Sequence, residues 1–446
     1  MNAARYVVAG VARPRSAWFA EVSQWANAAA IPAEFVKCVG VDELRVRITS
    51  GRAFSAILVD GGLPGVDRDL LAVARDAGIA PLVVAEPAAA SRWLALGASA
   101  VLSPALGRAE LLDALASVAQ LISNADPTPS FEPVGGAPAP LHGQVIAVSG
   151  PGGTGASTIA IAAAQALAAD NDRSTTGDVV LADLRLRAEL GMLHDAQAVT
   201  PGLQELVDAH RNARPTPQQI RELCFAVHGR DYRLLLGLRR HRLWTTLRPG
   251  AVAAAFDGLC AAFSYVVADV GSDLEGEDVS GSVDVEERNV LNRTAVRRAD
   301  VVLAVGHASL KGLHSLTSLI QDLRDFGVQP DRIQPIINAA PSSARARAAF
   351  TRALSELVPP QRSSLAVERD GAIVAEVCPP AFVPVRNVDA CLRSATPLPS
   401  AVVDPVGAAV LHRLRAGYAA QNEPTPNGRR VTPGFLRRGA VGQGMP

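Results

Sequence analysis

Lysine is nearly absent from this 446-residue chain: only Lys37 and Lys311 contribute to the 43 Lys and Arg residues. Arginine therefore carries almost all of the positive charge, which 43 Asp and Glu residues balance to a formal net charge of zero. A protein that binds nucleic acid through bulk charge needs clustered excess Lys and Arg. The composition therefore argues against a specific nucleic-acid partner.

Cysteine is also scarce, and the chain has no long uninterrupted apolar run. The five cysteines are widely separated and none forms a C-x-x-C pair, which favours reduced thiols over a disulfide framework or a zinc site. Residues 1–10 have no long apolar stretch, so we expect no signal peptide, and the apolar run 156–169 is shorter than the roughly 18 residues that a membrane span requires. We expect a cytoplasmic protein without a transmembrane segment, and peripheral association with the inner membrane face stays open.

Two segments lack the pattern of a folded core. Residues 124–141 hold five prolines and two glycines, which exclude a continuous helix or strand. The tail beyond about residue 421 is rich in Pro and Arg and has few residues that build a core. The chain is therefore predicted to have four parts: a first domain at 1–123, a linker at 124–141, a second domain at 142–418 and a disordered tail at 419–446.

Both predicted domains show short β-rich runs that alternate with stretches of helical composition, which is the pattern of a parallel α/β sheet. The first domain is predicted to have five strands, at 6–11, 35–39, 56–60, 81–85 and 100–102. The second has near-continuous apolar runs, as expected for a doubly wound sheet covered by helices on both faces. These runs lie at 145–149, 179–183, 233–236, 265–269, 301–305 and 332–338.

The most informative stretch is VIAVSGPGGTGAST at residues 145–158, in which an apolar strand leads through a glycine loop into an Ala-rich helix. Glycines let backbone N–H groups converge on a phosphate, the helix N-terminus adds partial positive charge, and a Ser or Thr hydroxyl there can ligate Mg²⁺. Gly150, Gly155 and Ser157 fit the phosphate-loop spacing, but Ala156 takes the place of the lysine. A glycine-rich turn that binds no phosphate is the alternative.

In this frame the loop resembles that of the deviant Walker ATPases of the MinD/ParA group, which reads S-G-K-G-G-x-G-K-[ST]-[ST]. Residues 149–158 match without a gap, but Pro151 and Ala156 stand where the family has lysines. Because losing one preorganised charge costs roughly 10²–10³ in rate, we expect slow or no hydrolysis and assign no catalytic residue. The resemblance implies ATP and Mg²⁺ as cofactors, with nucleotide contacts at Gly150, Gly152, Gly153, Thr154, Gly155, Ala156, Ser157 and Thr158.

Three further positions resemble the family's functional residues. Asp183 stands where the first switch begins, although Arg185 replaces the second acid of its D-x-D motif. Asp269 follows an apolar strand like the Walker B acid, so the resemblance implies that Ser157, Asp183 and Asp269 ligate Mg²⁺. Asn338 resembles the strand-terminal Asn that recognises adenine. Each acid or amide also suits a helix cap or a turn.

Within the group, the stretch VTPGLQEL at 199–206 and a receiver-like domain ahead of the ATPase resemble the CpaE/TadZ branch and its actinobacterial septum-site-determining relatives. The likeness covers residues 1 to 415. It implies a regulator of septum site selection that works with protein partners of the division machinery, while homodimer formation stays open. The alternatives are polar localisation of a Tad/Flp pilus or secretion machine, and a nucleotide-free scaffold.

The first domain resembles a phosphoryl receiver in which Asp60 aligns with the phosphoacceptor and Pro64 follows four residues later. The acidic pair, the Ser or Thr and the Lys that the chemistry needs are missing, because those places read Ala9-Gly10-Val11, Ala85 and Ser103-Pro104. We therefore expect a pseudo-receiver that serves in docking or dimerisation, with no phosphorylation of Asp60.

Two groups of basic residues carry no motif. His194 and the cluster at 239–242 are expected to lie on solvated faces, since nothing in the sequence fixes their geometry. Lys311 is assigned to the surface for the same reason.

Overall fold

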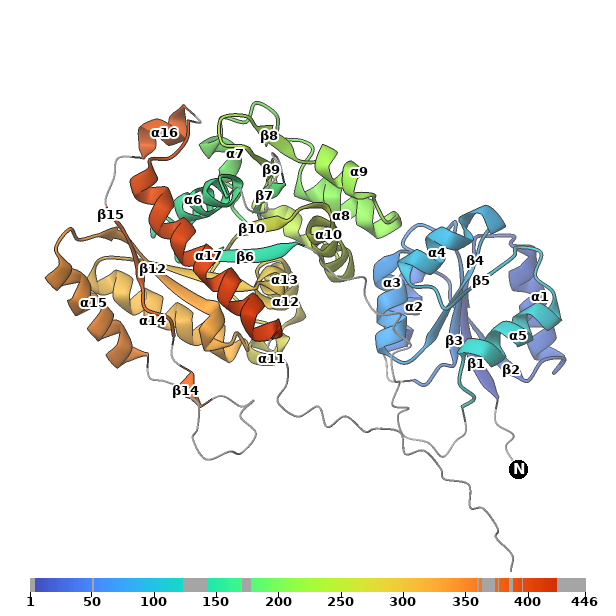
Figure 1. Ribbon diagram of the computed structural model, residues 1–446. Coiled ribbons are helices and arrows are strands. Elements are labelled where there is room, and N and C mark those ends of the chain that lie inside the picture. The colour runs from blue at the N-terminus through green and yellow to red at the C-terminus, as the bar shows by residue number, and fades with distance from the viewer. Residues whose placement is uncertain are drawn as a thin grey trace, which may run out of the picture.

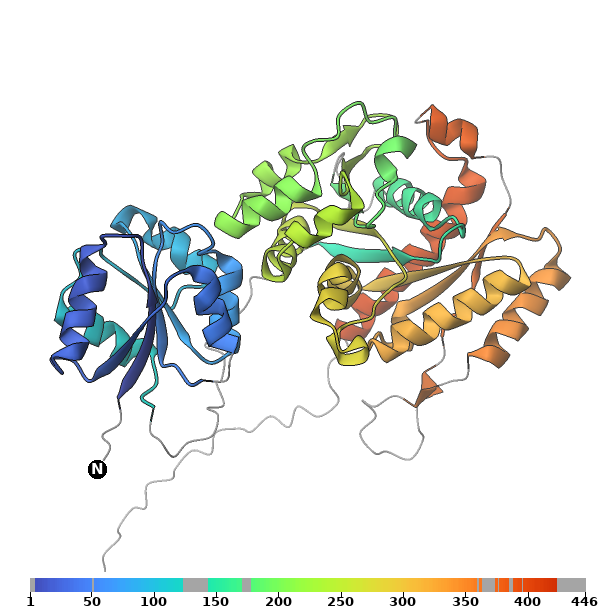
Figure 2. The same cartoon turned by 180° about the vertical axis from the view of Figure 1, so that it is seen from behind.

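Two large β-sheets, each with helices on both faces, build the described part of the protein (Figures 1 and 2), and β13 (Gln361–Arg362) and β14 (Val374–Ala375) pair as a small two-stranded sheet. The computed structural model describes residues 5–49, 52–122, 143–170, 178–358, 361–362, 374–375, 377–384, 388–394 and 396–422. The linker predicted at 124–141 and the tail predicted to be disordered, beyond residue 422, lie outside the described residues.

The first sheet has five strands in the order β2-β1-β3-β4-β5, all parallel. The strands are β1 (Tyr6–Val11), β2 (Ala33–Lys37), β3 (Ala56–Asp60), β4 (Ala80–Val84) and β5 (Ala100–Leu102). Helices α1 (Ala17–Asn27) and α5 (Arg108–Val118) cover one face. Helices α2 (Val41–Thr49), α3 (Arg68–Asp76) and α4 (Ala90–Leu96) cover the other.

The central strands β1 and β3 are buried along their whole length, as their apolar runs predict. From β1 the chain moves to β2 on one side of the sheet. It then returns to the other side of β1, where β3, β4 and β5 follow in order, so the strand order reverses between β1 and β3. In open parallel sheets, ligands bind outside the carboxyl ends of the strands at such a reversal. This edge of the first sheet is therefore a place to look for a ligand site.

The second sheet has eight strands in the order β15-β12-β11-β6-β10-β7-β9-β8. The strands are β6 (Gln144–Ser149), β7 (Val179–Asp183), β8 (Phe225–Val227), β9 (Tyr232–Leu235), β10 (Tyr265–Val270), β11 (Val301–His307), β12 (Ile333–Ala340) and β15 (Ala381–Pro384). Seven strands are parallel, and only the edge strand β8 is antiparallel, to β9. The predicted doubly wound parallel sheet is confirmed, with this edge strand as its exception.

Helices cover both faces of the second sheet. On one face lie α6 (Ala156–Ala168) and the long α17 (Ser400–Asn422), which crosses the sheet in Figure 1. The other face carries α8 (Leu203–Asn212), α10 (Pro249–Ala262), α13 (Val290–Arg298) and α14 (Leu310–Asp325). The remaining elements are η1 (Pro87–Ala89), α7 (Leu190–Leu193), α9 (Pro217–Glu222), η2 (His241–Thr246), α11 (Glu277–Ser280), α12 (Val283–Arg288), η3 (Pro330–Arg332), α15 (Ala344–Leu357) and α16 (Asp389–Arg393).

Polar contacts join the two sheet units where α3 meets α8 and α10. The Asp67 carboxylate accepts from Arg211 at 2.9 Å, and Arg68 Nε donates to a carbonyl at the end of α8 at 3.0 Å. Asp69 Oδ1 accepts from the Gly250 N–H at 2.7 Å, which caps the first turn of α10. These contacts fix α3 against the second unit.

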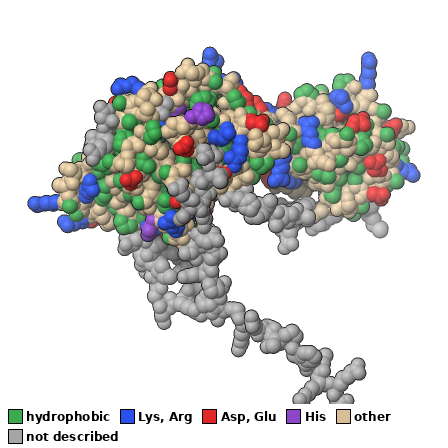
Figure 3. Space-filling model, turned by 45° about the horizontal axis from the view of Figure 1, so that its top comes forward, with side chains coloured by type: hydrophobic (Ala, Val, Ile, Leu, Met, Phe, Trp, Pro, Cys, Tyr) green, Lys and Arg blue, Asp and Glu red, His purple; other side chains and the backbone are tan. Residues whose placement is uncertain are grey.

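Within the described residues, no helix combines the length and the apolar character that a bilayer span requires. On the face shown in Figure 3, Lys and Arg side chains are interspersed with Asp and Glu, in keeping with the zero formal net charge.

Candidate nucleotide-binding site

The glycine-rich loop lies at the carboxyl end of β6, in the middle of the second sheet. Gly153 and Gly155 both have φ of 82°, a region that residues with a side chain rarely adopt. Gly150 lies so close to β11 that a Cβ there would come within 2.9 Å of a backbone carbonyl. The Thr154 N–H and hydroxyl both donate to the Pro151 carbonyl, at 3.2 and 2.7 Å, and this closes the loop. The glycines thus hold a tight strand-to-helix turn.

The loop leaves space for an anion. No heavy atom outside the chain neighbours lies within 4 Å of an ideal Cβ at Gly152 or Gly153, and both glycines are exposed. Helix α6 begins at Ala156, so that Ser157 and Thr158 lie in its first turn. The structure therefore brings together the predicted loop residues 150–158 at a helix N-terminus, where an anion is favoured. Nucleotide contact by these residues stays a prediction.

Arg185 reaches into this loop from the carboxyl end of β7. Its Nε donates to Asp269 Oδ1 at 2.8 Å, and its Nη2 donates to the Gly150 carbonyl at 3.3 Å. The Arg185 side chain is 19% exposed and that of Asp269 is 1% exposed, so this is a largely buried ion pair. A guanidinium charge therefore lies beside the phosphate loop. The loop itself has no lysine, because its two lysine positions hold Pro151 and Ala156.

Two buried carboxylates lie below the guanidinium. Asp183 and Asp269 are register partners on β7 and β10, and both are almost fully buried. Burial, together with the neighbouring charge of Asp269, raises the pKa of Asp183 to about 7. Burial also raises the pKa of Asp269, against the charge and hydrogen bond of Arg185, which lower it. One more cation at this place would therefore be stabilised strongly.

The residues present fit a magnesium ion. Asp183 Oδ1 and Asp269 Oδ2 are buried without a hydrogen-bond partner among the described residues, and the hydroxyl of Ser157 lies near enough to Asp269 to lower the pKa of its carboxyl. Carboxylate and hydroxyl oxygens are the ligands that Mg²⁺ prefers. No cluster of three or more His, Cys, Asp and Glu that could hold a metal occurs in the described ranges, so an ion here needs further oxygens from a ligand or water. Metal binding by Ser157, Asp183 and Asp269 stays a prediction.

Asn338 lies at the edge of the same loop. Its Nδ2 donates to the Thr154 carbonyl at 2.9 Å, and it packs against Gly155, where a Cβ would collide with the amide. The strand β12 thus places Asn338 beside the phosphate loop, and its amide nitrogen is engaged with backbone in this state. Recognition of adenine by Asn338 stays a prediction.

The approach of Arg185 to the loop was missed from the sequence. The sequence predicts only that Arg185 removes the second switch acid. The sequence held one usable signal: Arg185 comes two residues after Asp183, which ends a strand that lies next to the strand of Asp269. A long basic side chain at this position can turn back over the carboxyl edge.

The predictions for the remaining basic residues have mixed outcomes. His194 is only 3% exposed and is hydrogen-bonded to Tyr232, so its assignment to a solvated face was wrong. Lys311 is exposed at the start of α14, as predicted. The cluster at 239–242 is exposed and lines, together with Arg187, a hollow of about 390 Å³ on the same edge of the sheet as Arg185.

A glycine loop between a central parallel strand and a helix in a doubly wound sheet is the arrangement of phosphate-binding α/β folds. The strand order and the loop geometry carry this assignment.

No family model matches the chain, and no curated protein matches it. Among solved structures, it is similar to a ParA family ATPase from Chlorobium tepidum, with a TM-score of 0.45 and 16% identity over 60% of this chain and 99% of the other. MinD from Pyrococcus horikoshii, a septum site-determining protein complexed with Mg-ADP, gives a TM-score of 0.42 and 15% identity over 62% and 98%. Apo McdA from Cyanthece gives a TM-score of 0.41 and 17% identity over 61% of this chain and 99% of the other.

Proposed function

We propose that this chain is a MinD/CpaE-like regulator that binds Mg·ATP at residues 150–158, hydrolyses it slowly or not at all, and takes part in selecting the division septum site. The observation that carries the nucleotide part is the position of Arg185, whose guanidinium bridges Gly150 and Asp269 next to Ser157. It supplies a fixed positive charge in a loop that has no lysine.

The chain's own groups divide the binding between them. The Thr154 N–H is used within the loop, so the other backbone N–H groups of 152–158, at the N-terminus of α6, would hold phosphate oxygens. Ser157, Asp183 and Asp269 would hold Mg²⁺, which supplies countercharge to the β- and γ-phosphates when bound. Arg185 adds N–H donors on the side of Asp269.

The same residues explain why hydrolysis should be slow. Pro151 has no N–H and Ala156 has no charge, so neither can stabilise the charge that develops on the transferred phosphoryl group. Arg185 replaces the acid that would position the attacking water, and a guanidinium is a hydrogen-bond donor without acceptor capacity. The loop therefore suits retention of a nucleotide rather than rapid turnover.

Calorimetric titration of the full chain with Mg·ATP tests the nucleotide site. We expect binding that weakens by about tenfold or more in EDTA or in Ser157→Ala, because the metal bridges the hydroxyl and the phosphates. Ser318→Ala, an exposed serine on α14, is the matched control and should bind as the wild type does. Equal affinity with EDTA or in Ser157→Ala would contradict the proposed metal site, and no binding at all would favour the nucleotide-free scaffold.

The division role is supported by the resemblance of residues 199–206 and by the five-stranded domain that precedes the phosphate loop. Its protein partners would then belong to the division machinery, and the alternative is the positioning of a Tad/Flp pilus or secretion machine. Depletion of the protein should produce misplaced septa, with a fluorescent fusion concentrated at division sites. Normal septa combined with loss of surface pili would contradict the division role and support the pilus alternative.

A further inference from the structure

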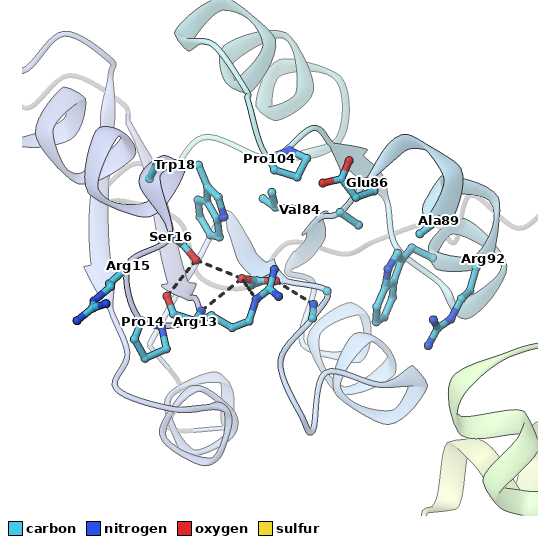
Figure 4. Close-up of a pocket in the computed structure, with 16 residues that line it drawn as sticks. Arg13, Pro14, Arg15, Ser16, Trp18, Val84, Glu86, Ala89, Arg92 and Pro104 are labelled. Carbon is cyan, nitrogen blue, oxygen red and sulfur yellow. Dashed lines mark hydrogen bonds and ion pairs between the residues drawn. The ribbon is translucent and has the colours of Figure 1, made fainter.

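Each of the two large sheets has a strand that ends in a buried aspartate, Asp60 on β3 and Asp183 on β7. In the pocket of Figure 4, both oxygens of Asp60 are used by neighbouring loops. Its Oδ2 accepts from Arg13 Nε at 2.8 Å and from Ser16 Oγ at 3.3 Å, and its Oδ1 accepts from the Gly62 N–H at 2.9 Å. Asp60 is therefore fully engaged in holding its own loops together.

Asp183 is held differently, through one of its two oxygens. Its Oδ2 accepts from the Leu190 N–H at 2.8 Å, whereas its Oδ1 is buried without a hydrogen-bond partner among the described residues. The Leu190 N–H is the first of α7, so this carboxylate satisfies a donor that the helix itself cannot satisfy. The bond fixes the Asp183 side chain and leaves Oδ1 for another ligand.

Helix α7 needs support from outside, because its four residues make a single turn that is not stable by itself. His194 follows the helix and is 3% exposed. Its Nδ1 lies 2.6 Å from the Leu190 carbonyl, and its Nε2 lies 2.7 Å from the hydroxyl of Tyr232, the first residue of β9. Because a carbonyl only accepts, Nδ1 carries the proton and Nε2 accepts from the hydroxyl. Leu190 is thus held at its N–H by Asp183 and at its carbonyl by His194.

The two side chains that support Leu190 are dry and uncharged. Tyr232 is 2% exposed, and its ring meets that of His194 edge to face, with the centroids 5.8 Å apart. Burial lowers the pKa of His194 to about 4 and raises the pKa of Tyr232 to about 12. Both groups therefore keep the same donors and acceptors near neutral pH, and the chain of bonds from Tyr232 to Asp183 is permanent in the folded protein.

We propose that His194 and Tyr232 are positioning residues of the magnesium site, which hold Leu190 and so keep Asp183 Oδ1 available to the metal. This role rests on the proposed binding of Mg·ATP. Neither side chain touches the metal, because each acts through the backbone of Leu190. Partners that orient a metal ligand change metal affinity by roughly 10- to 100-fold.

The test is calorimetric titration of the full chain with ATP, once in Mg²⁺ and once in EDTA. His194→Leu removes both side-chain hydrogen bonds, and we expect it to weaken binding in Mg²⁺ by about tenfold and to leave binding in EDTA unchanged. Tyr232→Phe removes only the hydroxyl and should cost about threefold in Mg²⁺. His194→Asn carries an amide that can donate to the Leu190 carbonyl in place of Nδ1, so it should bind more tightly than His194→Leu.

His210 provides a matched control on α8. It is 2% exposed, and its Nδ1 lies 2.8 Å from the carbonyl of Leu206, four residues earlier, as His194 Nδ1 does from Leu190. The Leu206 N–H, however, donates to the Gly202 carbonyl and not to a carboxylate. His210→Leu should therefore lower stability as His194→Leu does, measured by urea midpoints, and keep the wild-type difference between Mg²⁺ and EDTA.

The outcomes separate this role from the proposed function. If the wild type binds ATP more tightly in Mg²⁺ and His194→Leu keeps the full difference, the positioning role is wrong and the metal site stands. A loss of equal size in EDTA, or in His210→Leu, would show a general effect on the fold and would also overturn the role. A wild type that binds ATP equally in Mg²⁺ and EDTA would contradict the metal site itself, and the positioning role with it.

Discussion

At the scale of the residue, Arg185 decides how the phosphate loop is charged. It contacts Asp269, which lies 84 positions later in the chain, and Gly150, which lies 35 positions earlier. Such an approach depends on the packing of three neighbouring strands, which no local pattern encodes. The sequence therefore predicted which residues surround the loop, but could not show that an arginine folds back over the two buried acids.

His194 is a second residue whose role comes from its burial. Its Nδ1–H donates to the Leu190 carbonyl at 2.6 Å, so its Nε2 accepts from the Tyr232 hydroxyl at 2.7 Å. These partners define one neutral tautomer, and burial lowers the pKa of His194 from 6.5 to about 4. The folded protein thus carries an uncharged imidazole at the end of α7.

We predict a pH dependence of stability from this histidine. Between pH of about 6.5 and 4 the unfolded chain binds a proton that the folded chain excludes, so stability falls as the pH falls, by up to about 1.4 kcal/mol per pH unit. His194→Gln cannot titrate and should lose less stability between pH 7 and 4.5, as measured by urea midpoints. His412→Gln, exposed on α17, is the control. Parallel losses in wild type and His194→Gln would contradict the account.

At the scale of the element, the apolar runs predicted the strands well because buried parallel strands have a strong local signal. The runs 6–11, 56–60, 100–102 and 179–183 coincide with β1, β3, β5 and β7, and other boundaries moved by one to two residues. Strand β8 was missed because it has three residues and an exposed Phe225 at the sheet edge. Its antiparallel pairing to β9 runs through the turn at 228–231, where Gly229 and Asp231 are residues typical of turns.

The packing of α17 on α6 depends on one small residue. Gly407 faces Ala166, and a Cβ at position 407 would lie 2.7 Å from the Ala166 methyl group. We predict that Gly407→Leu lowers the free energy of unfolding by about 1–3 kcal/mol, because the helices must separate. Ala408→Leu, on the exposed side of the same turn, should change it by less than about 0.5 kcal/mol. Urea unfolding measures both, and equal midpoints for the two variants would show that this contact is not tight.

At the scale of the whole molecule, α3 of the first unit is held against α8 and α10 of the second by Asp67, Arg68 and Asp69. Asp67 lies between Arg45 and Arg211, at 3.0 and 2.9 Å, and is buried. The sequence showed two α/β units but gave no sign of this contact. It depends on charged side chains from helices that are far apart in the chain.

Assembly should not respond to nucleotide. The resemblance implies a lysine that reaches across a nucleotide-bound dimer, and Pro151 takes its place without charge or N–H. A ligand shifts an equilibrium only through its different affinity for the two states, and this difference is removed with the lysine. Sedimentation velocity should therefore give the same distribution with and without Mg·ATP. A shift from monomer to dimer would mean that another residue, such as an arginine, bridges the subunits.

Titration of Arg185→Ala with Mg·ATP measures whether Arg185 provides the positive charge of the phosphate loop. We predict a loss of affinity of about 10- to 100-fold, the range expected for hydrogen bonds to a charged phosphate. Arg185→Lys should recover part of it by restoring charge beside Asp269, and Arg187→Ala, exposed two residues later, should bind as the wild type does. Unchanged or tighter binding in Arg185→Ala would contradict the claim and show that the arginine blocks the loop instead.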